Sequence, residues 1–188
     1  MNSIAIKLPD WFDEYEEGST EYRTTEGKMT LAIEVARRNV DEDLGGPFGA
    51  AVFERDTGRL ISVASNRVMD EECSVLHAEV LAIILAQRKR GSYTLAESGS
   101  PACELVTSCA PCCMCMGAII WSGVKRLVCG AREVDAFEVG FDEGPKPDDW
   151  VAEFASRGIE VVQDVRRGRA RELFSRYIES GGVVYNPE

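Results

Sequence analysis

Apolar positions along the chain recur with two spacings, one typical of helices and one typical of strands. Between Met29 and Asn39 they fall three and four residues apart, which places them on one face of a helix. Short runs rich in Val, Ile and Leu, bounded by glycine and polar turn residues, predict strands. The predicted helices are 29–39, 76–90, 112–121, 151–157 and 169–180. The predicted strands are 48–55, 59–65, 105–107, 124–129 and 159–162.

Glycine and proline mark the breaks between these elements. Gly45-Gly46-Pro47 follows the first predicted helix and prevents its continuation. Asp56-Thr57-Gly58 has the composition of a tight turn, so the first two strands are predicted to form a hairpin. Pro111 stands near the start of a predicted helix, where proline is tolerated.

The order of the elements predicts the fold class. The later strands alternate with helices, which requires crossover connections and therefore parallel pairing with helices on both faces. The opening hairpin makes the sheet mixed. We expect an α/β protein with three α/β/α layers around a mixed five-stranded sheet. Residues 28–188 are predicted to form one domain, and residues 1–27 an acidic, aromatic arm that packs on this domain or on a second subunit.

Charge and hydropathy exclude several classes of partner. The chain has 32 acidic and 21 basic residues, a formal net charge of −11 that disfavours a phosphate backbone. A basic run, Arg166, Arg167, Arg169 and Arg171, is interpreted as the solvated face of a helix. No apolar stretch is long enough to span a membrane, and the N-terminus does not have the pattern of a secretory signal. We expect a cytoplasmic protein without nucleic-acid or membrane partners.

Four of the seven cysteines lie between Cys109 and Cys115, a clustering that indicates metal or redox chemistry. Cys112 and Cys115 are three residues apart at the start of a predicted helix, so their thiols share a face near the positive end of the helix dipole. Two thiolates at this spacing form half of a tetrahedral zinc site. Cys109 and Cys112 have the same spacing, but Cys109 is predicted to lie in a loop, which favours Cys112 and Cys115.

His77 is the single histidine, and Glu79 follows two residues later. Three ligands, His77, Cys112 and Cys115, leave a fourth position for water, as in catalytic zinc sites. Zinc lowers the pKa of such a water to about 7, and a nearby unbound carboxylate, here Glu79, can move its proton. A structural site with Cys109 as fourth ligand and a redox CxxC pair are the alternatives. Both leave the segment around Glu79 without a role.

These segments together carry a resemblance to a known family. His-x-Glu followed by Pro-Cys-x-x-Cys, with 34 residues between His77 and Cys112, resembles the pattern of the cytidine-deaminase-like zinc nucleobase deaminases. The resemblance implies a Zn²⁺ cofactor held by His77, Cys112 and Cys115, with Glu79 as the proton carrier.

Within that superfamily the chain is most similar to bacterial guanine deaminases. The segments that carry this similarity are 47–50, 115–121 and 140–143. The resemblance implies substrate-binding roles for Phe48, Asn66, Ala78, Asp142 and Tyr185. It also implies a second acid in the segment Gly140-Phe141-Asp142-Glu143, for which both Asp142 and Glu143 are candidates and Glu143 is preferred.

The function expected from this resemblance is the hydrolytic deamination of guanine to xanthine and ammonia. The substrate is then a small purine base that reacts with water. Deamination of cytosine, of adenosine in tRNA, or of another amino-azine such as an aminotriazine is the alternative. A zinc-binding module without enzymatic activity is the second alternative. The family implies a homodimer, and whether its C-terminal segments are swapped is left open.

Overall fold

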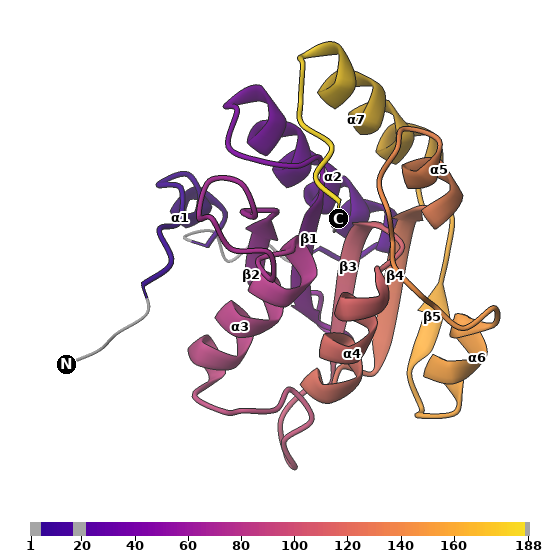
Figure 1. The fold of residues 1–188 in the computed structure, drawn as a ribbon. Helices are drawn as coiled ribbons and strands as arrows, with labels where there is room; N and C mark the ends of the chain where they lie inside the picture. The colour runs from indigo at the N-terminus through magenta and orange to yellow at the C-terminus, as the bar shows by residue number, and fades with distance from the viewer. Residues whose placement is uncertain (1–4, 17–21, 187–188) are drawn as a thin grey trace.

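The central sheet has five strands in the order β2-β1-β3-β4-β5, with β3 in the middle. The computed structural model describes residues 5–16 and 22–186 (Figure 1). The strands are β1 (Gly49–Glu54), β2 (Leu60–Ser65), β3 (Cys103–Cys109), β4 (Arg126–Ala131) and β5 (Glu160–Val162). β1 pairs antiparallel with β2 and with β3, whereas β3, β4 and β5 are parallel. The predicted mixed five-stranded sheet is therefore confirmed.

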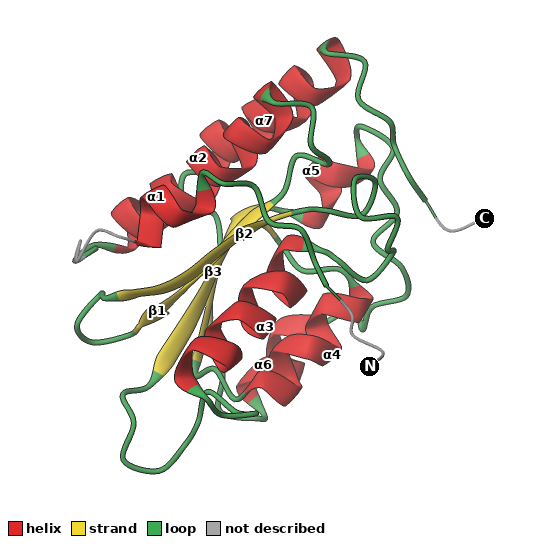
Figure 2. Ribbon diagram, turned by 90° about the vertical axis from the view of Figure 1, so that its left-hand side faces the viewer, coloured by secondary structure: helices red, strands yellow, loops and turns green. Residues whose placement is uncertain are grey.

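Helices cover both faces of this sheet and complete the three predicted layers (Figure 2). Figure 2 shows α1, α2 and α7 on one face, and α3, α4 and α6 on the other. The longer helices are α2 (Thr25–Asp41), α3 (Ala78–Arg90), α4 (Cys113–Ser122) and α7 (Arg167–Glu179). The shorter ones are α1 (Phe12–Glu16), α5 (Glu133–Phe137) and α6 (Trp150–Ala155). None of the described helices is long and apolar enough to cross a membrane.

The strands nearest the centre are buried along their whole length. Every residue of β1 and β3 is buried, because helices cover both faces and other strands flank both edges. Phe53 and Leu105 are fully buried, and they pack in the main apolar core with residues of α2 and α3. This burial on both faces explains why these strands lack alternation between apolar and polar positions.

The start of α2 differs from the prediction. The helix begins at Thr25 because Thr24 caps it, with the Gly27 amide donating to Thr24 Oγ1 at 3.1 Å. Trp11 and Phe12 of the predicted arm are buried against the body of the same chain. α2 thus crosses the boundary placed at residue 27, and the division into arm and domain stays a prediction; residues 17–21 lie outside the described part.

The secondary structure differs from the prediction at β3 and at two short helices. β3 is longer than the predicted strand and ends at Cys109, so this cysteine lies in a strand and not in a loop. The short helices α1 and α5 were not predicted. In α5, the Asp135 carboxylate accepts from the Arg132 amide at 2.8 Å and stabilises the first turn. This helix therefore depends on a capping hydrogen bond, which a search for apolar periodicity does not detect.

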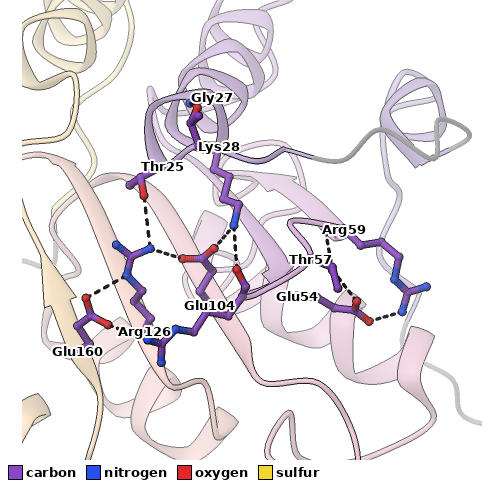
Figure 3. Close-up of polar contacts among 11 residues, drawn as sticks. Thr25, Gly27, Lys28, Glu54, Thr57, Arg59, Glu104, Arg126 and Glu160 are labelled. Atoms are coloured by element: carbon purple, nitrogen blue, oxygen red, sulfur yellow. Dashed lines mark hydrogen bonds and ion pairs between the residues drawn. The ribbon is translucent and has the colours of Figure 1, made fainter.

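The two ends of the parallel strands have different roles. At the amino ends, the buried Glu104 pairs with Lys28 from α2, and its Oε2 accepts from Arg126 Nη1 at 2.9 Å (Figure 3). Arg126 Nε reaches Glu160 Oε1 at 3.3 Å, which joins β3, β4 and β5. The carboxyl ends carry the polar cluster described next, the usual place for a binding site in sheets of this type.

Candidate active site

His77 lies at the amino end of α3, immediately before its first residue. Its backbone is extended, with φ −67° and ψ 153°, and Ala78 begins the helix. His77 is therefore the N-cap residue of α3, and its imidazole makes no capping hydrogen bond, so the ring remains available for other partners. Ala78, one of the predicted substrate contacts, is fully buried in the first turn.

Cys112 has the same position at the start of α4, and Cys115 lies in the first turn of that helix. The Cys115 amide donates to Cys112 Sγ at 3.5 Å, a contact that orients the Cys112 thiol at the helix end. His77 Nδ1 lies 3.5 Å from Cys112 Sγ and 3.6 Å from Cys115 Sγ. The structure therefore brings together the three predicted ligands, from two separate helices.

The distances and the donor types fit a zinc ion. Zinc bonds of about 2.3 Å to sulfur and 2.0–2.1 Å to nitrogen, at tetrahedral angles, separate sulfur from nitrogen by about 3.6 Å. The two measured separations, 3.5 and 3.6 Å, agree with this value. Two cysteines and one histidine are the donor set of a catalytic zinc site with one open position. The residues present thus fit the predicted cofactor.

Cys109 is separate from this cluster. Its thiol lies 3.8 Å from the Arg132 carbonyl oxygen, and it packs in a smaller apolar core with Phe141 and Phe174. Among the described residues, the metal-type cluster contains three members and Cys109 is not one of them. The preference for Cys112 and Cys115 is consistent with the structure, although the reason given for it, a loop position of Cys109, was wrong.

Thiol and imidazole groups of the cluster perturb one another. The pKa of the Cys112 thiol is lowered to about 4, mainly by the hydrogen bond with Cys115 and also by His77, against the effect of burial. The same contact with Cys112 raises the pKa of Cys115, and burial adds to this. Burial alone would lower the pKa of His77, but the bond with Cys112 and the charge of Glu79 raise it overall. A bound metal ion favours the thiolates and the neutral imidazole instead.

Two carboxyl groups are buried beside the cluster, Glu79 in the first turn of α3 and Glu143 in the loop after α5. Each side chain is 6% exposed. Burial raises the pKa of Glu79, and the nearby charge of Cys112 adds to this. Burial also raises the pKa of Glu143, to about 8, with further contributions from the charges of Cys112 and Glu79. Both acids therefore lie in the electrostatic field of the metal cluster.

Asp142 and Glu143, the two candidates for the second acid, differ in their surroundings. Asp142 is exposed, and its Oδ1 accepts from the Gly144 amide at 2.8 Å within its own loop. Glu143 is buried, and its carbonyl oxygen accepts from the Cys113 amide at 2.9 Å, which ties the loop to the start of α4. This geometry favours Glu143 as the acid that faces the cluster.

Three of the predicted substrate contacts lie around the same region. Phe48 is half-buried, and its ring centroid lies 5.1 Å from that of Phe141. Tyr185 reaches Phe141 from the C-terminal tail, with ring centroids 5.6 Å apart, and the charges of Glu79 and Glu143 act on its phenol. Asn66, 1% exposed, follows β2.

Buried polar atoms without partners include one on each of two predicted substrate contacts, Asn66 and Tyr185, and others elsewhere in the described chain, such as Trp11 Nε1. Within the described residues, Asn66 Nδ2, Tyr185 Oη and Thr107 Oγ1 are buried and have no hydrogen-bond partner. Buried polar atoms are nearly always paired, so unpaired ones indicate a polar ligand or ordered water. Thr107 was not predicted, because a threonine in a buried strand carries no distinguishing sequence signal.

Asn186 is a second residue that the sequence analysis missed. Its Oδ1 accepts from the Asp142 amide at 2.9 Å, and its Nδ2 donates to the Gly140 carbonyl oxygen at 2.8 Å. It therefore holds the C-terminal tail, with Tyr185, against the loop that carries Glu143.

Two cysteines and one histidine with an adjacent glutamate outside the donor set are the arrangement of the zinc-dependent hydrolytic deaminases. Comparison with known families agrees with this class. Residues 23–131 match the family described as "Cytidine and deoxycytidylate deaminase zinc-binding region". The chain belongs to this family, which confirms the predicted resemblance and the zinc cofactor.

The most informative relatives are guanine deaminases. A solved guanine deaminase from Nitrosomonas europaea is 46% identical with a TM-score of 0.91, and the match covers 94% of this chain and 97% of that one. Guanine deaminase from Bacillus subtilis is 39% identical over 115 residues, 61% of this chain and 69% of that protein. A probable cytosine deaminase from Schizosaccharomyces pombe is 32% identical over 136 residues, 70% of this chain and 78% of that protein. Another similar structure, 45% identical with a TM-score of 0.91, is of a complex with 8-azaguanine; the match covers 94% of this chain and 96% of that one.

Proposed function

We propose that the protein deaminates guanine by hydrolysis and releases xanthine and ammonia. The observation that carries the proposal is a three-ligand metal cluster with two buried carboxyl groups beside it, Glu79 and Glu143. The similarity of nearly the whole chain to a guanine deaminase supports guanine as the substrate.

His77, Cys112 and Cys115 hold zinc in this proposal. Zinc, when bound, acidifies water and supplies a hydroxide nucleophile at neutral pH. Glu79 accepts the proton of the attacking water and delivers it to the base, because its carboxyl group lies beside the ligands without belonging to the donor set. Its burial keeps competing water away from this proton.

Recognition of the base is assigned to residues around the cluster. Guanine has a flat ring and an amidine-like edge, with the amine that leaves on C2 between two ring nitrogens. Phe48 packs against the ring, Asn66 uses its unpaired Nδ2 to donate to a ring acceptor, and Tyr185 closes the pocket from the tail. Ala78 packs at the bottom of the pocket at the start of α3.

The second acid is assigned to Glu143. It contacts the N–H groups of the amidine edge and assists the departure of ammonia. Asp142 does not act on the base directly; it shapes the loop through its bond to the Gly144 amide.

A panel of substrates tests the choice of base. The zinc-loaded protein is incubated with guanine, cytosine, an aminotriazine and a tRNA transcript, and ammonia is measured. We expect the highest kcat/KM with guanine. Ammonia from cytosine but none from guanine would overturn the proposal, and ammonia from none of them would favour a zinc-binding module without activity.

Four variants test the assigned roles. H77A is expected to lose both zinc and activity, whereas E79A keeps zinc and loses about 10²–10⁴-fold in kcat, the usual contribution of a general acid–base group. E143Q lowers kcat for guanine, and D142N is its matched control with nearly normal turnover. Full zinc content in H77A, or unchanged turnover in E143Q, would contradict the corresponding assignment.

We also propose a homodimer. Trp121 near the end of α4 is 86% exposed, and tryptophan is one of the residues enriched in subunit interfaces. The tail that carries Tyr185 packs on its own chain through Asn186, so an unswapped arrangement is preferred. Light scattering after gel filtration should give twice the monomer mass for the wild-type protein and the monomer mass for W121E. A monomeric wild-type protein would refute the dimer.

For the location we propose the cytoplasm. The chain's seven cysteines are all free, and the thiolates of a zinc site persist in a reducing compartment. Fractionation of cells with an antibody against the protein would test this.

A further inference from the structure

Asn39 is a fully buried polar residue near the end of α2, away from the metal ligands. Its side chain is 0% exposed, and asparagine is a poor helix former, so the position costs stability unless the amide is well bonded. The amide has two N–H donors and one oxygen with two lone pairs. A residue of this kind on the largely apolar buried face of α2 requires an explanation.

Both donors of Asn39 are used on two different loops. Nδ2 donates to the Gly46 carbonyl oxygen at 3.0 Å and to the Asn66 carbonyl oxygen at 3.1 Å. Its Oδ1 accepts from Ser65 Oγ at 2.8 Å. One side chain thus connects α2, the loop before β1 and the residue that follows β2.

The backbone of Asn66 is fixed by this bond, while its side-chain amide stays available. Asn66 Oδ1 accepts from the Val68 amide at 3.2 Å, and Nδ2 has no partner within the described residues. The Asn66 amide also donates to the Phe48 carbonyl oxygen at 3.0 Å. The direction in which Nδ2 points therefore depends on a backbone that Asn39 holds.

The loop before β1, which contains Gly45 and Gly46, packs against Tyr185. A Cβ atom on Gly46 would lie 2.4 Å from Tyr185 Oη, so the phenol rests directly against this glycine. A Cβ atom on Gly45 would lie 2.4 Å from the Asn66 carbonyl oxygen, so the two loops are in close contact. A small displacement of Gly46 would therefore move both the phenol and the Asn66 backbone.

We infer that Asn39 is a positioning residue that sets the place of Asn66 and of the Gly46 loop for binding of the base. It touches neither the base nor the metal ligands and acts through these two segments. The inference rests on the proposed function, in particular on the role of Asn66 in binding.

This arrangement predicts which kinetic constant changes. Asn66 contacts the base in the ground state and in the transition state alike, and loss of such uniform binding raises KM and leaves kcat nearly unchanged. The candidate metal ligands and Glu79 lie in α3 and α4 or directly before them. The side-chain hydrogen bonds of Asn39 go to Gly46, Asn66 and Ser65, which are outside both helices. The effect of an Asn39 substitution should therefore appear in KM.

Three variants, N39A, S65A and N66A, test the inference with guanine turnover, zinc content, thermal unfolding and calorimetric binding of 8-azaguanine. N39A removes both donor bonds, and we expect KM and the Kd of 8-azaguanine to rise about tenfold, with kcat changed less than about threefold. S65A is the matched control, because it removes a buried hydrogen bond of Asn39 and keeps both donor bonds. It should lose stability and keep KM. If N39A does not fold, N39S, whose shorter side chain cannot reach both carbonyl oxygens, replaces it.

The outcomes separate the inference from the function on which it rests. A raised KM in N39A and N66A, with a normal KM in S65A, supports it. A raised KM in N66A but not in N39A overturns the inference and leaves the role of Asn66 intact. An unchanged KM in N66A overturns the role of Asn66 and the inference with it, and an equal rise in S65A and N39A shows a general loss of structure instead.

Discussion

Removing one partner of the buried ion pair between Lys28 and Glu104 should be among the most destabilising single substitutions outside the apolar core, because it leaves a charge buried without its partner. The Glu104 side chain is 0% exposed and that of Lys28 is 6% exposed. E104Q keeps the volume of the side chain and removes its charge. Arg126 is 19% exposed and keeps Glu160 as a partner. In E104Q the Lys28 ammonium loses its buried counter-charge and keeps neutral contacts, the Arg55 carbonyl oxygen at 3.3 Å and the Phe53 ring at 5.4 Å from the centroid.

The expected magnitude follows from this burial. Breaking a buried pair by removing one partner costs about 3–5 kcal/mol, because the remaining charge is left in the interior. The lower end applies here because Arg126 retains Glu160, so we expect E104Q to lose about 3 kcal/mol in the free energy of unfolding. For a chain of this size each kcal/mol shifts the midpoint by about 2–4 °C, which gives roughly 6–12 °C.

The measurement is urea and thermal unfolding of the zinc-loaded protein, followed by circular dichroism. E153Q is the control, because Glu153 and Arg157 form an ion pair with both side chains about half exposed, at 48% and 45%. Such a pair contributes less than about 1 kcal/mol. K28M/E104Q should recover much of the loss, since it removes the unpaired charge.

Activity provides a second readout of the same variant. The ion-pair network of Glu104 lies at the amino ends of β3 to β5, and the candidate metal ligands lie at the carboxyl ends of the strands. We therefore expect kcat/KM per folded molecule to stay unchanged in E104Q. If the free energy of unfolding of E104Q lies within about 1 kcal/mol of the wild-type value, as expected for the exposed control E153Q, the reasoning that burial makes this substitution costly is refuted.

The other predictions concern the site, the charges of α7 and the metal. G46A should raise KM for guanine with normal zinc content, because the added Cβ would meet Tyr185 Oη at 2.4 Å. An unchanged KM would contradict the importance of the contact between Gly46 and Tyr185. The hydrogen bonds from Arg167 lower the pKa of Asp135, so this carboxylate stabilises the fold above its unfolded pKa and loses that effect as pH falls through its lower folded pKa. D135N should therefore have a lower free energy of unfolding than the wild type near neutral pH, and urea unfolding should show this difference disappearing below about pH 4. A difference that stays constant with pH would contradict the role of the Asp135 charge. Chelation of zinc should abolish ammonia release and lower the unfolding temperature, and added Zn²⁺ should restore both.

Most of the secondary structure follows from local patterns in the sequence. The helix that became α3 and the hairpin of β1 and β2 were predicted from apolar spacing and from turn chemistry at Gly58. There φ is +74°, and a Cβ atom would lie 2.2 Å from the Tyr22 carbonyl oxygen. The helices α1 and α5 were missed, because five residues are too few to show helical periodicity.

The candidate metal ligands were predictable for the same reason. Cys112 and Cys115 are three residues apart, and His77 is the single histidine with Glu79 two residues later, so spacing and residue type carry the signal. The choice between Asp142 and Glu143 could not be made from spacing, because adjacent acids in a loop differ only in burial.

Periodicity and short spacings within segments were enough to predict the fold class, the zinc chemistry and three candidate ligands, His77, Cys112 and Cys115, which the folded chain brings together. The strand position of Cys109, the burial of Glu143 and the bonds of Asn39 to two loops are visible only in the folded chain. Asn39 and Asn66 are 27 residues apart, and Lys28 and Glu104 are 76 apart. Such contacts form only when the sheet brings distant segments together, and a linear pattern contains no record of which segments meet.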